Sequence, residues 1–153
     1  MTVDMTTRQT TGSRVIAASP EKIFEVLSDA SLHAVIDGSG MVSGNSGRAE
    51  LLELGTKFGM KMRLGLVPYR IGNEVVEFEP NRRIAWRHFG HHVWRYELEE
   101  VEGGTLVTET FDWSTSRSPK GIELMGYPAK HEGNIERTLE RLDAYLTNRA
   151  NSL

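Results

Sequence analysis

The chain contains 153 residues, of which 39% are hydrophobic and 25% are charged, a size and composition that fit one compact domain with a sizeable core. The 18 basic and 21 acidic residues leave a net charge of −3, which excludes a broad basic surface for nucleic acid. The sequence has no cysteine, which excludes disulfides, thiolate metal sites and thiol nucleophiles. No apolar run is long enough to span a membrane, and the first eleven residues lack the apolar stretch of a secretory signal. We therefore expect a cytoplasmic protein.

The N-terminal part predicts one strand followed by two short helices. We expect residues 1–11 to form a polar tail and residues 12–150 to form a single domain that begins with the strand Gly12–Ala18. This strand ends at residues 19–21, where a capping serine, a proline at the first helical position and an acidic residue in the first turn together predict a helix. The sequence SLHAVI predicts the second short helix.

Between residues 41 and 115, apolar side chains recur at every second position, and glycine or proline marks the breaks. This pattern predicts an antiparallel sheet of about seven strands, counting the first one. In the strand KFGMKMRL, one face collects three large apolar side chains: Phe58, Met60 and Met62. In the next strand, alternation places Val76 and Phe78 inward and Val75 outward.

Two hairpins are expected to set the register of the last three strands. A loop of residues 90–92 pairs His88 with Trp94, and a two-residue turn at Gly103-Gly104 pairs Tyr96 with Phe111. The inner face then consists of three rows, which are His88–Trp94–Trp113, Trp86–Tyr96–Phe111 and Ile84–Leu98–Glu109.

The C-terminal part predicts a long helix with one interruption. Ser118-Pro119 repeats the helix start signal, and apolar residues recur at helical spacing to about Arg149. We expect a kink or break near Tyr127-Pro128, because proline lacks a backbone donor and clashes with the preceding turn. The whole order of elements predicts an α+β fold, in which a curved antiparallel sheet buries its apolar face against the long helix.

Four segments are typical of one known superfamily: VIAASPEKIFEVLSD, VVEFEPNRRIAWRH, WRYELEEVEGGTLVTETFDWS and ERTLERLDAYL. Through them, residues 12–149 resemble the helix-grip fold of the START/Bet v 1-like (SRPBCC) superfamily, and within it the polyketide cyclase/dehydrase-like branch. The resemblance implies a sheet wrapped around the C-terminal helix. It also implies a cavity between them that binds hydrophobic or aromatic small molecules and, in some members, a reaction on them.

The expected inner face gathers large rings, including all three tryptophans of the chain, together with methionines. Such rings are difficult to pack densely against one helix, and methionine adapts to irregular space. An ordinary core explains the same pattern, and the residues alone leave both interpretations open; the resemblance favours a pocket. We therefore predict these ligand-binding residues: Phe58, Met60, Met62, Trp86, Trp94, Tyr96, Phe111, Trp113 and Tyr127.

His88 and Glu109 are the ionisable residues that the predicted register turns inward. Burial raises the pKa of a carboxyl and lowers that of an imidazole, so either group could transfer a proton near neutral pH. They lie two rows apart, too far for a direct hydrogen bond, although both could contact one substrate. The alternative is that Glu109 pairs with a neighbour such as Arg63 or a tyrosine hydroxyl, and that His88 bonds to the backbone at the rim.

His88, His91 and His92 form a cluster of the kind that can bind a metal. We expect no metal site, because His88 points inward while the other two lie in a solvated turn. His33 and Asp37 share one face of the second short helix. We expect a polar surface there, with Asp37 closing the helix end; a gate or ligand contact is the alternative.

Three functions follow from these predictions. The first is the binding of a hydrophobic small molecule (aromatic, polyketide-like or lipid-like) without a cofactor, with no nucleic acid and no membrane span involved. The second is a cyclase or dehydratase that uses His88 and Glu109 as acid and base. The third is an interaction module without a ligand. The oligomeric state is left open.

Overall fold

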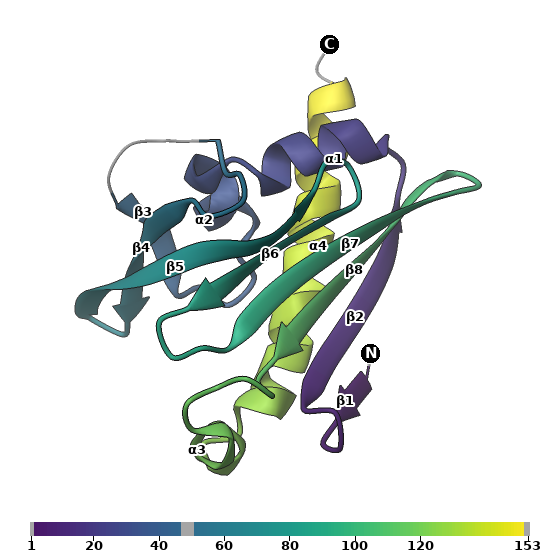
Figure 1. Cartoon of the computed structure of the whole chain (residues 1–153). Coiled ribbons are helices and arrows are strands. Elements are labelled where there is room, and N and C mark those ends of the chain that lie inside the picture. The colour runs from purple at the N-terminus through teal and green to yellow at the C-terminus, as the bar shows by residue number, and fades with distance from the viewer. Residues whose placement is uncertain (1, 47–50, 152–153) are drawn as a thin grey trace.

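The computed structural model describes residues 2–46 and 51–151 and has an α+β fold (Figure 1). Its single antiparallel sheet has eight strands in the order β1-β2-β8-β7-β6-β5-β4-β3. The strands are β1 (Thr2–Asp4), β2 (Gln9–Ile16), β3 (Val42–Ser46), β4 (Lys57–Leu64), β5 (Val67–Glu79), β6 (Arg83–His88), β7 (Val93–Val101) and β8 (Gly104–Asp112). The helical segments are α1 (Pro20–Leu27), the 3₁₀ turn η1 (Ala30–Leu32), α2 (His33–Ile36), α3 (Pro119–Leu124) and α4 (Tyr127–Asn151). No helix in this described part combines the length and the apolar character of a membrane span.

The predicted helix-grip arrangement is confirmed. In Figure 1, α4 runs along one face of the sheet, α1 and α2 lie toward one end of it, and α3 lies at the other end. The Thr10 hydroxyl donates to the Pro128 carbonyl at 3.0 Å, and the Arg14 guanidinium donates to the Asp143 carboxylate at 2.7 Å. Strand β2 is therefore bonded to α4 at two points along the helix.

The sheet has one strand more than expected because the predicted N-terminal tail takes part in it. β1 pairs with β2, and β2 begins at Gln9 rather than at Gly12. Asp4 Oδ1 accepts hydrogen bonds from the backbone N–H groups of Thr6 and Thr7, which stabilises the turn between the two strands. Polar edge strands of this kind give no apolar alternation, so periodicity does not reveal them.

The helix start at Ser19 is confirmed. The Ser19 hydroxyl accepts a hydrogen bond from the Lys22 N–H at 3.3 Å, and Pro20 is the first helical residue of α1. This places Ile23, Phe24 and their neighbours on the face that covers the sheet.

The predicted break in the C-terminal helix is also confirmed, slightly earlier than expected. Gly126, with φ of +74°, lies between α3 and α4 in the left-handed region that favours glycine. Pro128 lies in the first turn of α4, where its missing N–H leaves no helical hydrogen bond unmade.

The predicted pairings of the last three strands are wrong by two residues, although each strand keeps its expected inward face. Trp86 pairs with Trp94, and Tyr96 pairs with Glu109. The β7–β8 turn is Glu102-Gly103, since Val101 pairs with Gly104. A Cβ on Gly104 would lie 2.0 Å from the Ile16 carbonyl oxygen, so this glycine allows β2 to pass close by and is not a turn residue.

A β-bulge in β5 overturns the expected orientation of its two valines. The pairing with β6 shifts between Val75, opposite Trp86, and Glu77, opposite Ala85, so Val76 is the extra residue. Val75 is therefore fully buried in the core, whereas Phe78 points inward as expected.

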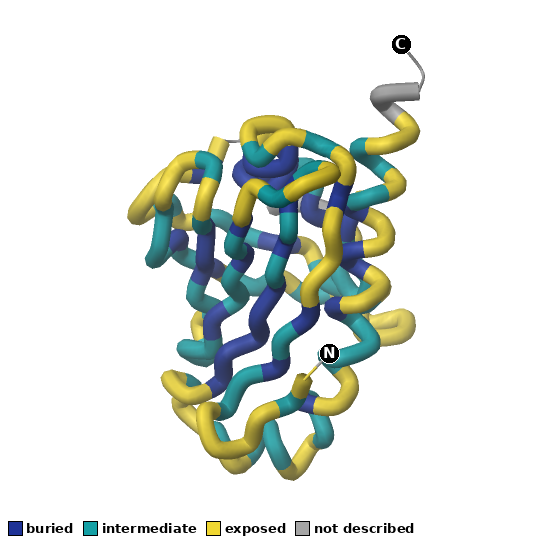
Figure 2. Tube along the Cα trace, turned by 90° about the vertical axis from the view of Figure 1, so that its right-hand side faces the viewer, coloured by how far each residue is buried: buried dark blue, intermediate teal, exposed yellow. Residues whose placement is uncertain are grey.

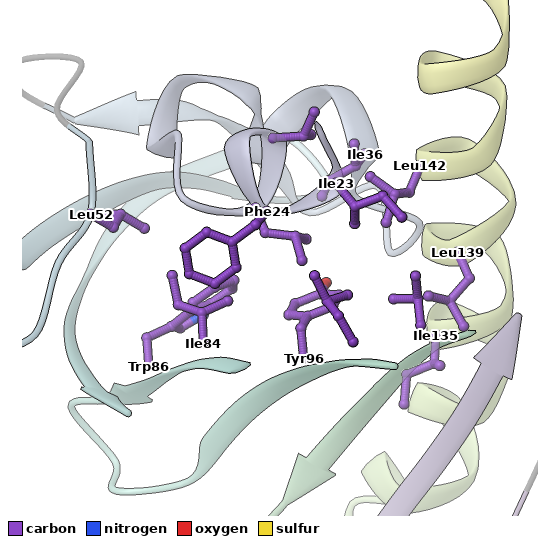
Figure 3. Packing of buried hydrophobic residues seen from close by; sticks show 14 of the residues in the cluster. Ile23, Phe24, Ile36, Leu52, Ile84, Trp86, Tyr96, Ile135, Leu139 and Leu142 are labelled. Atoms are coloured by element: carbon purple, nitrogen blue, oxygen red, sulfur yellow. The ribbon is translucent and has the colours of Figure 1, made fainter. Parts of the chain in front are cut away.

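The core lies between the sheet, α1 and the second half of α4. Buried positions alternate with exposed ones along the strands in Figure 2. In the close view of Figure 3, Phe24 points from α1 toward Ile84 and Trp86, and Ile23 lies beside Leu142. Helix α4 contributes three residues from the side: Ile135, Leu139 and Leu142. This packing fills one end of the space between sheet and helix.

Candidate functional site

The other end of this space is a cavity of about 580 Å³ with a largely apolar wall. Its wall is built by the sheet from β3 to β8, by α2 and the loop after it, and by α3 and the start of α4. Nine of the predicted site residues line it: Met60, Met62, Trp86, His88, Trp94, Tyr96, Glu109, Phe111 and Tyr127. The bulky rings of the sheet therefore surround space and do not fill it.

Phe58 and Trp113, which we predicted as ligand-binding residues, do not line the cavity. The Phe58 ring packs edge-on against Trp86, with centroids 5.8 Å apart. Trp113 is fully buried behind Phe111, and its Nε1–H donates to Glu123 at 3.0 Å. Both rings support the wall from behind.

Three rings lie side by side in the middle of the wall, because Trp86, Trp94 and Phe111 are paired across β6, β7 and β8. Trp94 and Phe111 have centroids 4.9 Å apart, and Tyr96 lies 5.6 Å from Trp86. The Trp94 and Phe111 rings are tilted by 40° to each other, and together with Trp86 they make this part of the wall aromatic and apolar.

Glu109 and Tyr96 form a buried hydrogen-bonded pair next to this row. The Tyr96 hydroxyl donates to Glu109 Oε1 at 2.8 Å. Glu109 is only 3% exposed, and its other oxygen, Oε2, has no hydrogen-bond partner within the described residues. Of the two partners predicted for Glu109, the tyrosine hydroxyl is the one observed, because the pairing of β7 with β8 places Tyr96 directly opposite.

Burial raises the pKa of Glu109 to about 8, and the nearby Asp37 carboxylate adds to this rise, against the opposing effect of the hydrogen bond from Tyr96. Burial also raises the pKa of Tyr96 well above its usual value, so the hydroxyl keeps its proton. At neutral pH the Glu109 carboxyl is therefore mostly protonated. Because Oε1 accepts from Tyr96, the acidic hydrogen on Oε2 is available as a donor.

His88 and His92 are stacked at the cavity wall, with centroids 4.4 Å apart. His88 Nδ1 accepts the Gly90 N–H at 3.1 Å, as expected for a rim histidine bonded to the backbone. The solvated position expected for His92 is wrong: His91 adopts φ of +71°, the loop closes earlier, and His92 turns inward opposite His88. Burial, with the charges of His88 and His131, lowers the pKa of His92 to about 3, so it is neutral.

His131 on α4 is a wall residue that sequence reasoning missed. Its ring lies 4.4 Å from Phe111 and 4.9 Å from Trp94, and it stacks on Tyr127 at 5.5 Å. Burial lowers its pKa to about 4. Its spacing of four residues from Tyr127 on one helix face was the available signal.

His33 is also part of the wall, contrary to the polar surface expected for it. It is 5% exposed, stacks on Trp86 at 4.7 Å, and its Nε2 bonds the Leu27 carbonyl at 3.0 Å. Because a carbonyl only accepts, Nε2 carries the proton, and burial lowers the pKa of the ring.

Asp37 closes the end of α2, as expected, and also orders the loop that follows. Its carboxylate accepts from the Ser39 hydroxyl and the Val42 N–H. The same loop is fastened to α4, because the Gly38 N–H donates to Thr138 at 2.8 Å and Arg137 donates to the Gly38 carbonyl at 2.9 Å. These bonds close the cavity on the side of α2.

The cavity opens beside α3 and the loop between β6 and β7. Lining residues that are exposed gather there, such as Phe89 at 64% and Met125 at 61%. Arg70 and Arg117 are the charged residues at this opening, and the Arg117 N–H donates to the Gly90 carbonyl. Tyr96 and Glu109 are buried and mark the inner end.

A metal centre is not among the features of this site. In residues 2–46 and 51–151, no three histidine, aspartate or glutamate side chains are arranged so that they could hold a metal ion.

A curved sheet that grips a long helix around an internal cavity defines a helix-grip domain of the START/Bet v 1-like superfamily. The chain belongs to the family described as polyketide cyclase/dehydrase and lipid transport, whose model matches residues 7–147.

Two similar sequences come from Mycobacterium tuberculosis. The chain is 37% identical over 141 residues to the uncharacterized protein Rv0088 of strain H37Rv, and 36% identical over 141 residues to the uncharacterized protein MT0096 of strain CDC 1551. Each match covers 88% of this chain but 63% of the relative, so the chain spans less than two thirds of the length of these relatives.

Solved structures show the same fold at low sequence identity. Protein Ms6760 of Mycobacterium smegmatis matches with a TM-score of 0.73 and 18% identity over 97% of this chain and 96% of its own. Protein NE0264 of Nitrosomonas europaea matches with a TM-score of 0.74 and 16% identity over 97% and 99%. An AHSA1-like protein of Aeromonas hydrophila matches with a TM-score of 0.66 and 19% identity over 90% and 93%.

Proposed function

We propose that this protein binds a hydrophobic small molecule in the cavity between its sheet and α4. The observation that carries the proposal is the cavity of about 580 Å³ with its largely apolar wall, a size within the usual range of small-molecule sites. The aromatic side chains of the wall, among them Trp86, Trp94 and Phe111, support an aromatic or polyketide-like ligand. Membership of a family whose description includes lipid transport supports a lipid-like ligand as well.

A variant that fills the cavity tests this proposal. Asn134 on α4 lines the cavity, whereas Glu136, two residues further along the same helix, is exposed. We expect Asn134→Trp to weaken binding of the fluorescent probe 1-anilinonaphthalene-8-sulfonate by about tenfold or more, and Glu136→Trp to leave it unchanged. Native mass spectrometry of the freshly purified protein would identify a bound molecule. Equal probe binding by both variants would place the ligand elsewhere and refute the proposal.

A cyclase or dehydratase is the second candidate, because His88 and Glu109 both line the cavity and one Glu109 oxygen finds no partner among residues 2–46 and 51–151. The two side chains lie two rows apart and do not bond each other, so any reaction would need a substrate that reaches both. Glu109→Gln keeps the size and hydrogen bonds of the side chain but removes its acid, so it should abolish turnover of a cyclisation substrate. Unchanged turnover would remove Glu109 from this role.

The third candidate is an interaction module without a ligand, which a filled core together with an exposed apolar patch would favour. The cavity does not fit that description.

A further inference from the structure

The carboxyl of Glu109, at the inner end of the cavity, is only partly satisfied by hydrogen bonds within the described residues. Glu109 is a lining residue of the cavity; its Oε2 is buried and has no partner within the described residues, while Oε1 is occupied by the Tyr96 hydroxyl. A buried polar atom without a partner loses the hydrogen bonds that water would give it, so it needs a partner from another source. A molecule in the cavity is placed to supply one.

We propose that the Glu109–Tyr96 pair is a binding subsite in which the Glu109 carboxyl donates a hydrogen bond to an uncharged acceptor oxygen of the ligand, such as a ketone, ester or amide carbonyl. This inference rests on the proposed function and names the group that the ligand carries at its inner end.

The direction of the hydrogen bonds follows from the Tyr96 hydroxyl. This hydroxyl has one hydrogen, and it donates that hydrogen to Glu109 Oε1 at 2.8 Å. A protonated carboxyl with one oxygen used as an acceptor presents its own hydrogen on the other oxygen. The subsite therefore offers a donor, and an acceptor oxygen of the ligand completes the chain of hydrogen bonds.

The groups around Glu109 keep it neutral. Gly12 is opposite it on β2, Tyr96 is opposite it on β7, and the negative charge of Asp37 acts on it from the loop after α2. From α4, the cavity wall contains His131, which is uncharged at neutral pH, and the uncharged Asn134 and Thr138. The cations Arg70 and Arg117 lie at the far, open end, so none of these groups compensates a negative charge on Glu109.

The subsite is tested with two probes of the same shape, 2-acetylnaphthalene, which has a carbonyl, and 2-isopropenylnaphthalene, which has a methylene group in place of the oxygen. Because the ketone is better hydrated in water, the informative quantity is the ratio of the two dissociation constants, compared between variants at pH 6.5. We expect the preference for the ketone to fall by about five- to tenfold from the natural protein to Glu109→Leu. It should stay within about twofold in Glu109→Gln, whose amide also donates.

A pH series on the natural protein gives the same test without an unfavourable substitution. Ionised Glu109 cannot donate, so the preference for the ketone should decline between pH 6.5 and 9.5 in the natural protein and stay constant in Glu109→Gln. Tyr96 keeps its proton in this range because its pKa is raised well above the usual value.

The outcomes separate the two proposals. The subsite is refuted if both probes bind with the same ratio of dissociation constants in the natural protein and in Glu109→Leu. It is also refuted if this ratio does not change with pH in the natural protein. Either result would still support a ligand site in the cavity. If neither probe binds, the proposed function fails, and the subsite fails with it.

Discussion

The raised pKa of Glu109 predicts that Glu109→Gln stabilises the protein at alkaline pH. In the folded protein this carboxyl has a pKa of about 8, against an ordinary value of 4.5. Between these two values the folded state holds a proton that the unfolded state has lost, so the free energy of unfolding falls as pH rises. The slope is about 1.4 kcal/mol per pH unit.

The expected magnitude follows from this slope. From pH 5 to pH 8.5 the natural protein should lose about 4 kcal/mol of stability through Glu109. Most of this loss occurs below pH 8, because above that pH the folded carboxyl is ionised as well and the two states no longer differ in bound protons. Glutamine does not titrate and can accept the same hydrogen bond from Tyr96, so Glu109→Gln should not show this loss. The difference in stability between the two proteins should therefore grow by that amount over the range.

Urea unfolding followed by circular dichroism at several pH values measures this difference. Comparing two proteins at each pH cancels the contribution of the buried histidines, which titrate below pH 6.5 and act in the opposite direction. Glu99→Gln, at an exposed position of β7, is the matched control and should show no such trend. A constant difference between the natural protein and Glu109→Gln would refute a buried, protonated carboxyl at this position.

Two further predictions concern the walls of the cavity. The pKa of His131 falls from 6.5 to about 4 in the folded protein, so the unfolded state binds more protons below pH 6.5 and stability falls with acidification. His131→Phe should therefore lose about 2 kcal/mol less than the natural protein between pH 7 and pH 5, measured by urea unfolding; an equal loss would contradict a neutral ring. A Cβ on Gly38 would lie 2.5 Å from the Thr138 backbone nitrogen, so Gly38→Ala should displace the loop after α2 away from α4. We expect this variant to lower the free energy of unfolding by about 1–3 kcal/mol in the same assay. Gly72→Ala has open space and serves as control, and similar stability of both variants would show that the loop is not held tightly.

The inner face of the sheet could be predicted well from the sequence because side chains alternate with a period of two. The predicted pairings were wrong by two residues in both hairpins, yet Trp86, Trp94, Tyr96 and Phe111 face inward as expected. An even slip preserves the face of every residue and changes only its neighbours. Alternation therefore identified the wall residues, whereas the contacts among them depended on where each turn closes.

The residues that sequence reasoning missed owe their positions to tertiary contacts. His92 faces inward because His91 adopts a left-handed conformation, which few residues other than glycine take and which no pattern indicated. His33 is buried because α2 packs over Trp86, and His131 because α4 passes in front of Phe111. In each case a polar residue type suggested the surface, and packing between distant segments overrode that expectation.

The Glu102-Gly103 turn is the detail on which the chemistry of the cavity depends. With the turn one residue later, Glu109 would lie opposite Leu98 and would lack the hydroxyl of Tyr96; with the observed turn, the two side chains are direct neighbours on one face. An apolar residue at position 109 would avoid the cost of burying a carboxyl among these rings. The chain nevertheless carries a glutamate there, and one of its oxygens has no partner in the part of the chain that the structure describes. Residues that do not suit their surroundings, such as a polar group in an apolar core, are concentrated at the functional sites of folded proteins. The position therefore fits a subsite whose partner is the ligand better than it fits a structural role.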